Sequence, residues 1–160
     1  MITATHLHAM VIHFPIALLI IGFFFALVSI FSKNTFFRTA SIWLLFIGTI
    51  GTTIAFLSGD AAGEGIEGGL LALAVEEHEE SAELTLWLAW SVTFIFMITE
   101  ILKNRFVWLR VIGIIVFAAC ITSLSRTGYL GGHLVYQHGA GVEVASSFGT
   151  TTGQQSGDND

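Results

Sequence analysis

Four long apolar runs constrain this chain more than any other feature of its sequence. They cover about residues 10–31, 37–57, 84–102 and 106–125, and each is close to the roughly 20 residues that an α-helix needs to cross a bilayer. Hydrophobic residues make up 54% of the 160 residues and charged residues only 11%, whereas a soluble domain carries about 25% charged residues. The sequence therefore predicts an all-α fold that forms a four-helix transmembrane bundle. The lipid bilayer is the partner that this composition implies.

The charged residues divide between the two ends of these expected spans. Five of the six basic residues lie at the turns after the first and third spans, and Arg126 is the exception. Nearly all acidic residues lie at the opposite end. By the positive-inside rule the basic end is cytoplasmic. We therefore expect an antiparallel, up-down bundle in a bacterial inner (cytoplasmic) membrane, with both termini outside. The formal net charge of −6 argues against a nucleic-acid partner.

The longest connection runs from Ser58 to Glu83, between the second and third spans. It begins with glycine and acidic residues. Residues 70–75 are apolar but too short to span, so we expect a short interfacial helix in this outer loop. Residues 1–145 are predicted to form the membrane domain, and the polar residues 146–160 are predicted to form a disordered tail.

All six histidines lie at the end of the spans opposite the basic residues, namely His6, His8, His13, His78, His133 and His138. In an antiparallel bundle, three separate segments bring these imidazoles to one face. Imidazole is the commonest metal ligand near neutral pH and a common axial ligand of haem iron. The first span and the segment after the fourth are neighbours in the simplest bundle order. We therefore predict His13 and His133 as the axial pair of a haem b.

The remaining histidines are given supporting roles. His8 and His138 are candidates for a second axial pair or for hydrogen bonds to haem propionates, and His78 is a further cofactor-binding candidate. His8 and His13, like His133 and His138, are five residues apart, which places them about 140° apart on a regular helix. Either each pair serves two sites, or the helix is distorted.

Two other residues bear on the site. Pro15 predicts a kink or a helix start that re-aims His13, because proline removes a helical hydrogen bond and restricts the residue before it. Arg126 is expected to pair with Asp60, with a glutamate of the long loop, or with a haem propionate.

Two alternatives remain open. The histidines with Asp60 form a nitrogen and oxygen ligand set that suits a non-haem copper, zinc or iron ion. In the second alternative, the histidines form a hydrogen-bonded polar cap, and the protein is a structural or assembly subunit that binds no cofactor. No hydrolytic or group-transfer motif is present, so a stand-alone enzyme is not predicted.

Several motifs together resemble a known family. They are HAMVIHFPIALL from His8, SGDAAG from Ser58, the single His78, and GGHLVYQHGAGV from Gly131. They are similar to the bacterial membrane family called domain of unknown function 2231, over about residues 6–142. The resemblance implies a four-helix membrane domain without an established activity, and His6 lies outside the family pattern. Some relatives are joined to cytochrome-type domains, which favours electron transfer.

These observations lead to one functional hypothesis. The chain is predicted to be a small membrane subunit that binds haem b through its outer-face histidines. It would pass electrons to or from quinone or a larger membrane or periplasmic redox complex.

Overall fold

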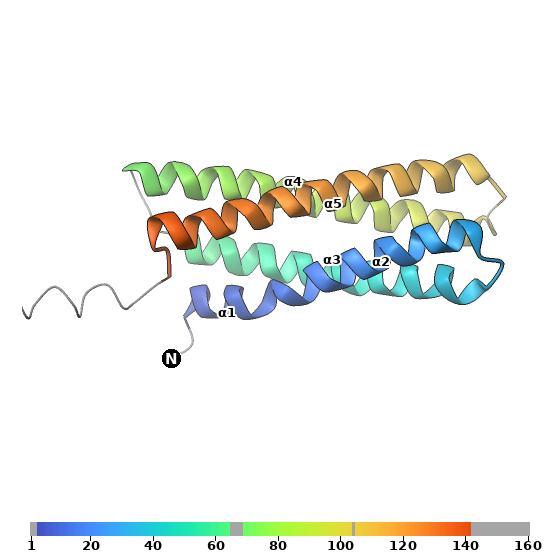
Figure 1. Cartoon of the computed structure of the whole chain (residues 1–160), viewed down its shortest axis with the longest axis horizontal. Helices are drawn as coiled ribbons and strands as arrows, with labels where there is room; N and C mark the ends of the chain where they lie inside the picture. The colour runs from blue at the N-terminus through green and yellow to red at the C-terminus, as the bar shows by residue number, and fades with distance from the viewer. Residues whose placement is uncertain (1–2, 65–68, 104, 142–160) are drawn as a thin grey trace, which may run out of the picture.

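The computed structural model describes residues 3–64, 69–103 and 105–141. They form five helices without a strand among them: α1 (Ala4–Val11), α2 (His13–Phe31), α3 (Thr35–Gly63), α4 (Gly69–Ile101) and α5 (Val107–His138) (Figure 1). Four helical stretches are long and apolar enough to cross a membrane, with α1 and α2 together forming the first. The predicted all-α fold with four candidate spans is therefore confirmed.

Contacts between consecutive long helices show that the chain reverses direction at each turn. Ser41 Oγ of α3 donates a hydrogen bond of 2.8 Å to the Gly22 carbonyl of α2, while the earlier Pro15 packs on the later Gly51. The α4 and α5 helices pair in the same way. In Figure 1 the chain passes back and forth along the long axis of the bundle, with α2 also packed on α5 and α3 on α4.

The interruption expected near Pro15 separates α1 from α2. Proline has no N–H to donate to the Val11 carbonyl, and α1 ends at Val11. Ile12 between the two helices keeps α-helical backbone angles (φ −57°, ψ −33°). The break is therefore slight, and α1 continues close to the direction of α2 (Figure 1).

Three helices continue past their expected spans at the end where the histidines lie. The α4 helix begins at Gly69 and runs without a break into the third span. Residues 70–75 are thus its first turns rather than a separate interfacial helix, because no glycine or proline interrupts the leucines, alanines and glutamates up to Leu84. The extension of α4 before Leu84 is about 22 Å long at 1.5 Å per residue. The tail at 146–160 lies outside the described residues.

Two names are used below for the ends of the bundle. The histidine end holds α1, the last turns of α3 and α5, and the first turns of α4. The arginine end holds the last turns of α2 and α4 and the first turns of α3 and α5, with Arg38 and Arg110.

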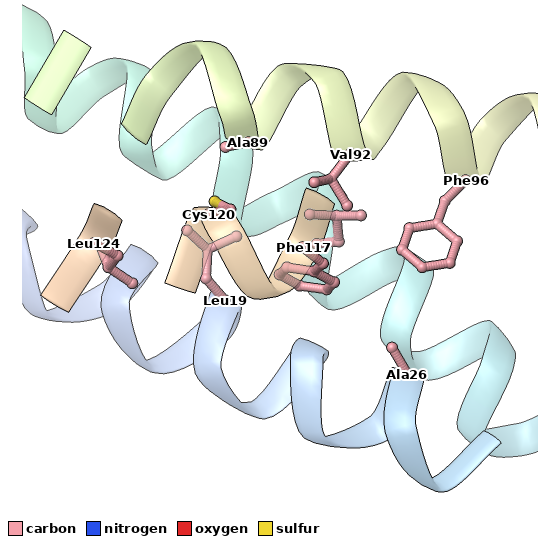
Figure 2. Close-up of a cluster of buried hydrophobic side chains, with 9 residues drawn as sticks. Leu19, Ala26, Ala89, Val92, Phe96, Phe117, Cys120 and Leu124 are labelled. Atoms are coloured by element: carbon pink, nitrogen blue, oxygen red, sulfur yellow. The ribbon is translucent and has the colours of Figure 1, made fainter. Parts of the chain in front are cut away.

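A tightly packed apolar core fills the middle of the bundle. Leu19, Phe117 and Cys120 are 0% exposed, and Cys120 is a free thiol. The Phe117 ring meets the rings of Phe23 and Phe96 edge to face, with centroids 5.2 Å and 6.1 Å away. Figure 2 shows side chains from α2, α4 and α5 converging on this centre. The core separates the polar groups at one end from those at the other.

The buried residues repeat along the chain with a constant offset. The buried residues of α2 recur 70 positions later in α4, as Pro15/Thr85, Leu19/Ala89, Gly22/Val92, Ala26/Phe96 and Ser29/Thr99. Buried residues of α3 recur 72 positions later in α5, as Ser41/Gly113, Leu45/Phe117, Gly48/Cys120, Gly51/Ser123 and Thr52/Leu124. The bundle therefore consists of two helical hairpins, α2–α3 and α4–α5, with the same packing register. Their contacts, α2 on α5 and α3 on α4, are those of an approximate twofold pair.

Candidate functional site

His8 of α1 lies in a niche formed by the end of α3. Its Nδ1 is 2.9 Å from the Ala55 carbonyl and 3.3 Å from Ser58 Oγ. The half-buried ring rests on Gly59, where a Cβ atom would come 2.9 Å from Cε1 of His8. Only a glycine leaves room for the imidazole against the α3 backbone.

His78 of α4 is held in an equivalent niche on α5. Its Nδ1 is 3.2 Å from the Thr127 carbonyl, and its half-buried ring rests on Gly131, where a Cβ atom would come 3.2 Å from Cε1. Thr127 and Gly131 follow Ala55 and Gly59 by 72 positions, and His78 follows His8 by 70. The two hairpins thus hold one histidine each in the same manner.

The two niches bring these rings together at the histidine end. The ring centroids of His8 and His78 are 6.4 Å apart, with the ring planes at 88°. A carbonyl oxygen only accepts hydrogen bonds, so each Nδ1 carries the proton and donates it. The neutral form of each ring therefore has its free lone pair on Nε2, which is the arrangement found in many metal-bound histidines.

Burial favours the neutral form of His78. This residue precedes the apolar run that begins at Leu84, so it lies outside the membrane-spanning part of α4. Its pKa is lowered mainly by burial and also by the nearby His8, while the bond to the Thr127 carbonyl acts in the opposite direction. A neutral imidazole is the form that binds a metal.

The other histidines are placed differently. His13 is exposed on the first turn of α2, and its Nδ1 donates to the Ala9 carbonyl of α1, four residues earlier, at 3.0 Å. His133 and His138, both on α5, have ring centroids 5.5 Å apart, and Tyr129 lies 6.3 Å from His133. The ring contacts thus join His8 to His78 and His133 to His138, and not His13 to His133. His6 is exposed and bonds to Thr3.

Acidic residues of α3 and α4 lie near one another at the histidine end. Glu79 turns its Oε1 toward Gly63 at the end of α3. Partial burial raises the pKa of Glu79, and the carboxylates of Asp60 and Glu76 raise it further. Arg126 is exposed, and no ion pair joins it to Asp60 or to another residue in the described parts of the chain. Nor do any three His, Cys, Asp or Glu side chains within those parts form a metal-binding group.

Hydroxyl groups of α4 and α5 form a hydrogen-bonded cluster next to the niche of His78. Thr127 Oγ1 lies 2.8 Å from Ser81 Oγ and 3.0 Å from Thr85 Oγ1, and Thr85 Oγ1 lies 2.8 Å from Ser123 Oγ. These bonds cross between α4 and α5, and such contacts hold membrane helices in register. They fix the position of Thr127 relative to α4, and hence the position of the carbonyl group that orients His78.

The pairing of His8 with His78 was missed by sequence reasoning, although the sequence contains a signal for it. Lys33 and Lys103 share the 70-residue offset of the two histidines. Arg38 and Arg110 are 72 residues apart, as are Gly59 and Gly131. An alignment of the chain with itself would have made the two histidines equivalent.

Comparison with known proteins agrees with the fold. A family model described as a predicted membrane protein, DUF2231, matches residues 4–144, which include every helix of the structure. No curated protein and no solved structure matches the chain. The resemblance seen in the histidine and glycine motifs is thus confirmed, and the chain belongs to the DUF2231 family of membrane proteins.

Proposed function

We propose that His8 and His78 are the axial ligands of a haem b at the histidine end, and that the protein is a small electron-transfer subunit. One observation carries this proposal: the two hairpins contribute one imidazole each, with both Nδ1 atoms tied to backbone carbonyls and the rings 6.4 Å apart. This pair takes the place of His13 and His133, which sequence order alone favoured.

The distance between the rings supports two ligands on opposite sides of one metal ion. An imidazole nitrogen lies about 2.0–2.1 Å from a metal, so the centroids of two rings in trans lie roughly 6 to 6.5 Å apart. Two rings at a tetrahedral angle would lie nearer, at about 5 to 5.5 Å by the same bond length. The separation of 6.4 Å between His8 and His78 matches the trans arrangement of axial haem ligands.

The number of protein ligands points the same way. A porphyrin supplies four nitrogens, so a six-coordinate haem needs only two histidines from the protein. A structural zinc site uses four protein ligands and a catalytic one three, and the described residues form no such group.

The surface of α5 next to His78 has room for a flat group. A Cβ atom at Gly128 would meet nothing within 4 Å. Arg126 is exposed two positions before Gly128 and is available to a haem propionate. In this proposal, His133 and His138 remain further partners for the propionates.

The position of the pair bears on which partners could reach it. His78 precedes the apolar run that begins at Leu84, and in this proposal it lies on the side that the positive-inside rule assigns to the periplasm. A haem held there is accessible to a periplasmic donor and lies near the outer lipid headgroups, where a quinone or the membrane part of a larger complex can approach.

An absorption spectrum of the purified protein tests the proposal. Protein expressed with sufficient haem is expected to show a Soret band, and sharp bands on reduction that are typical of two axial imidazoles. His8→Ala and His78→Ala should each abolish the low-spin spectrum, whereas His6→Ala should not, since His6 is exposed. A wild-type protein without haem, or the same spectrum in both alanine variants, would refute the proposal.

A non-haem metal ion is the second candidate, because the carboxylates of Asp60 and Glu79 lie near each other at the histidine end, and Glu79 directly follows His78 in the chain. Copper, zinc or iron would then be held by the imidazoles with a carboxylate and water. Elemental analysis of the sample used for the spectrum separates the two candidates: a metal in equal ratio to protein without a Soret band favours the bare ion.

A further inference from the structure

At the arginine end, as at the histidine end, each hairpin contributes one residue of the same type from an equivalent position. Arg38 and Arg110 occupy equivalent positions in the first turns of α3 and α5. The approximate twofold arrangement brings both side chains to one small polar cavity of about 10 Å³, which Ser29, Thr99 and Glu100 also line. That volume holds roughly one water molecule, so the side chains around the two arginines are closely packed.

Each arginine reaches from its own hairpin to the end of the other one. Arg110 Nη2 donates to the carbonyl of Ser29 at 2.9 Å and to its Oγ at 2.6 Å. Arg38 Nε lies 3.1 Å from Glu100 Oε1. Among the described residues, the Nε–H of Arg38 is a buried donor without a hydrogen-bond acceptor, because this ion pair lacks hydrogen-bond geometry. A further anionic group would therefore meet the exposed third of the Arg38 side chain.

The side chains around this cavity carry an excess of positive charge. Two guanidinium groups face one carboxylate, that of Glu100, which is the only acidic residue within the four expected spans. The N-termini of α3 and α5 add partial positive charge here, because neither helix has an acidic residue in its first turn. The side chains of Arg38 and Glu100 are only 33% and 35% exposed, so water screens this excess incompletely.

Neighbouring aromatic residues show the depth of the site. Phe36 lies two residues before Arg38, and Trp108 lies two residues before Arg110; the two side chains are 59% and 61% exposed. An exposed tryptophan at the end of a span is typical of the level of the lipid headgroups. The arginines are thus at the height of the lipid phosphates, on the side where the positive-inside rule places the cytoplasmic leaflet with its anionic lipids.

We propose that Arg38 and Arg110 bind the phosphate of an anionic lipid at the arginine end. A planar guanidinium group pairs with phosphate oxygens in a bidentate manner, and the lipid phosphate supplies the negative charge that Glu100 only partly provides. The bound headgroup lies across both hairpins, because each arginine comes from a different one. This proposal is independent of any group at the histidine end.

The test compares lipids and charge-matched variants of the whole chain. Binding of phosphatidylglycerol and phosphatidylcholine to the detergent-purified protein is measured by native mass spectrometry and by the shift of its thermal unfolding midpoint. Wild-type protein is expected to prefer phosphatidylglycerol. Arg38→Gln with Arg110→Gln should weaken phosphatidylglycerol binding at least about 10-fold, since the loss of even one charge-assisted guanidinium–phosphate hydrogen bond costs about that factor.

Lys33→Gln with Lys103→Gln is the matched control, because it removes the same charge from two exposed residues at the same end. It should keep most of the preference. An equal loss in both double variants would indicate a diffuse attraction and would overturn the site. Equal stabilisation of the wild type by inorganic phosphate, without lipid preference, would overturn the assignment to a lipid.

A further pair of variants guards against misfolding of the glutamine protein. Arg38→Lys with Arg110→Lys keeps both charges and loses the planar forks, so an intermediate affinity is expected. Glu100→Gln removes the competing carboxylate and should tighten phosphatidylglycerol binding. Unchanged affinity in both would contradict the proposal.

Discussion

The imidazoles of His8 and His78 meet edge to face with their centroids 6.4 Å apart, although the residues are 70 positions apart in the chain. Each ring is anchored on a different hairpin, His8 to the Ala55 carbonyl and His78 to the Thr127 carbonyl. Neither anchor depends on a flexible side chain, because both acceptors are backbone groups of long helices. The relative position of the two rings is therefore determined by the relative position of the two hairpins.

The choice of axial pair leads to the first prediction. His13→Ala and His133→Ala, together or singly, should leave the low-spin haem spectrum in place, because His13 is exposed and bonded to the carbonyl of Ala9, four residues earlier. His78→Ala should abolish it. Spectra of variants purified in parallel provide the measurement. Loss of the spectrum in the His13 and His133 variants, with its retention in the His78 variant, would restore the pair that sequence order favoured.

The glycine under His78 offers a sharp test of the niche. In Gly131→Ala, the new methyl group would lie 3.2 Å from Cε1 of His78, closer than ordinary van der Waals contact, so the ring must move. We expect haem affinity to fall by about 10-fold, in the range seen when groups that orient a ligand are lost. Haem titration of the apo-protein measures this.

Its control is the neighbouring glycine on the same helix. A Cβ atom at Gly132 would meet nothing within 4 Å. Gly132→Ala should keep the affinity and increase stability by up to about 1 kcal/mol, since alanine is the better helix former. Equal effects of the two substitutions would show that the helix, and not the ring, responds to the change.

The lowered pKa of His78 predicts a loss of stability in acid. Below about pH 6.5 the unfolded chain binds a proton at this residue, while the folded protein, with burial and His8 beside it, binds that proton only at lower pH. The free energy of unfolding should therefore fall as pH decreases through this window. His78→Gln should flatten the decrease in thermal midpoint between pH 7 and pH 5, and His6→Gln should not.

The hydroxyl cluster between α4 and α5 should contribute measurably to stability. Thr127→Val removes the bonds of Thr127 Oγ1 to Ser81 and Thr85. Interhelical bonds of this kind average about 0.6 kcal/mol in membrane proteins, with a maximum near 1.7. Thr122→Val is the comparison, because exposed Thr122 bonds only within its own helix. Unfolding of the two variants in the same detergent should show the larger loss for Thr127; the reverse order would argue against the cluster.

The number of spans and the end that carries the histidines were predictable because both depend on composition. Apolar runs and charge bias are properties of segments, so they do not require knowledge of how helices pack. The continuous α4 was not foreseen, because the apolar run at residues 70–75 is too short to span a bilayer and so predicted a separate interfacial helix. This run instead forms the first turns of the same helix that contains the third apolar span.

The ligand pair was harder to predict because it depends on the axial register between helices. His8 meets residues 47 and 50 positions away, and His78 meets one 49 positions away. A shift of one helical turn would place each ring against a different carbonyl. The small residues that set this register, such as Gly59 and Gly131, carry little signal in a single sequence unless the two halves are compared.

The hairpin repeat has a consequence for how any bound group behaves. Each hairpin contributes one imidazole, so neither hairpin alone holds a complete site, and a group coordinated by both imidazoles would link the two hairpins. Release of that group would then accompany separation of the hairpins, before the individual helices unfold.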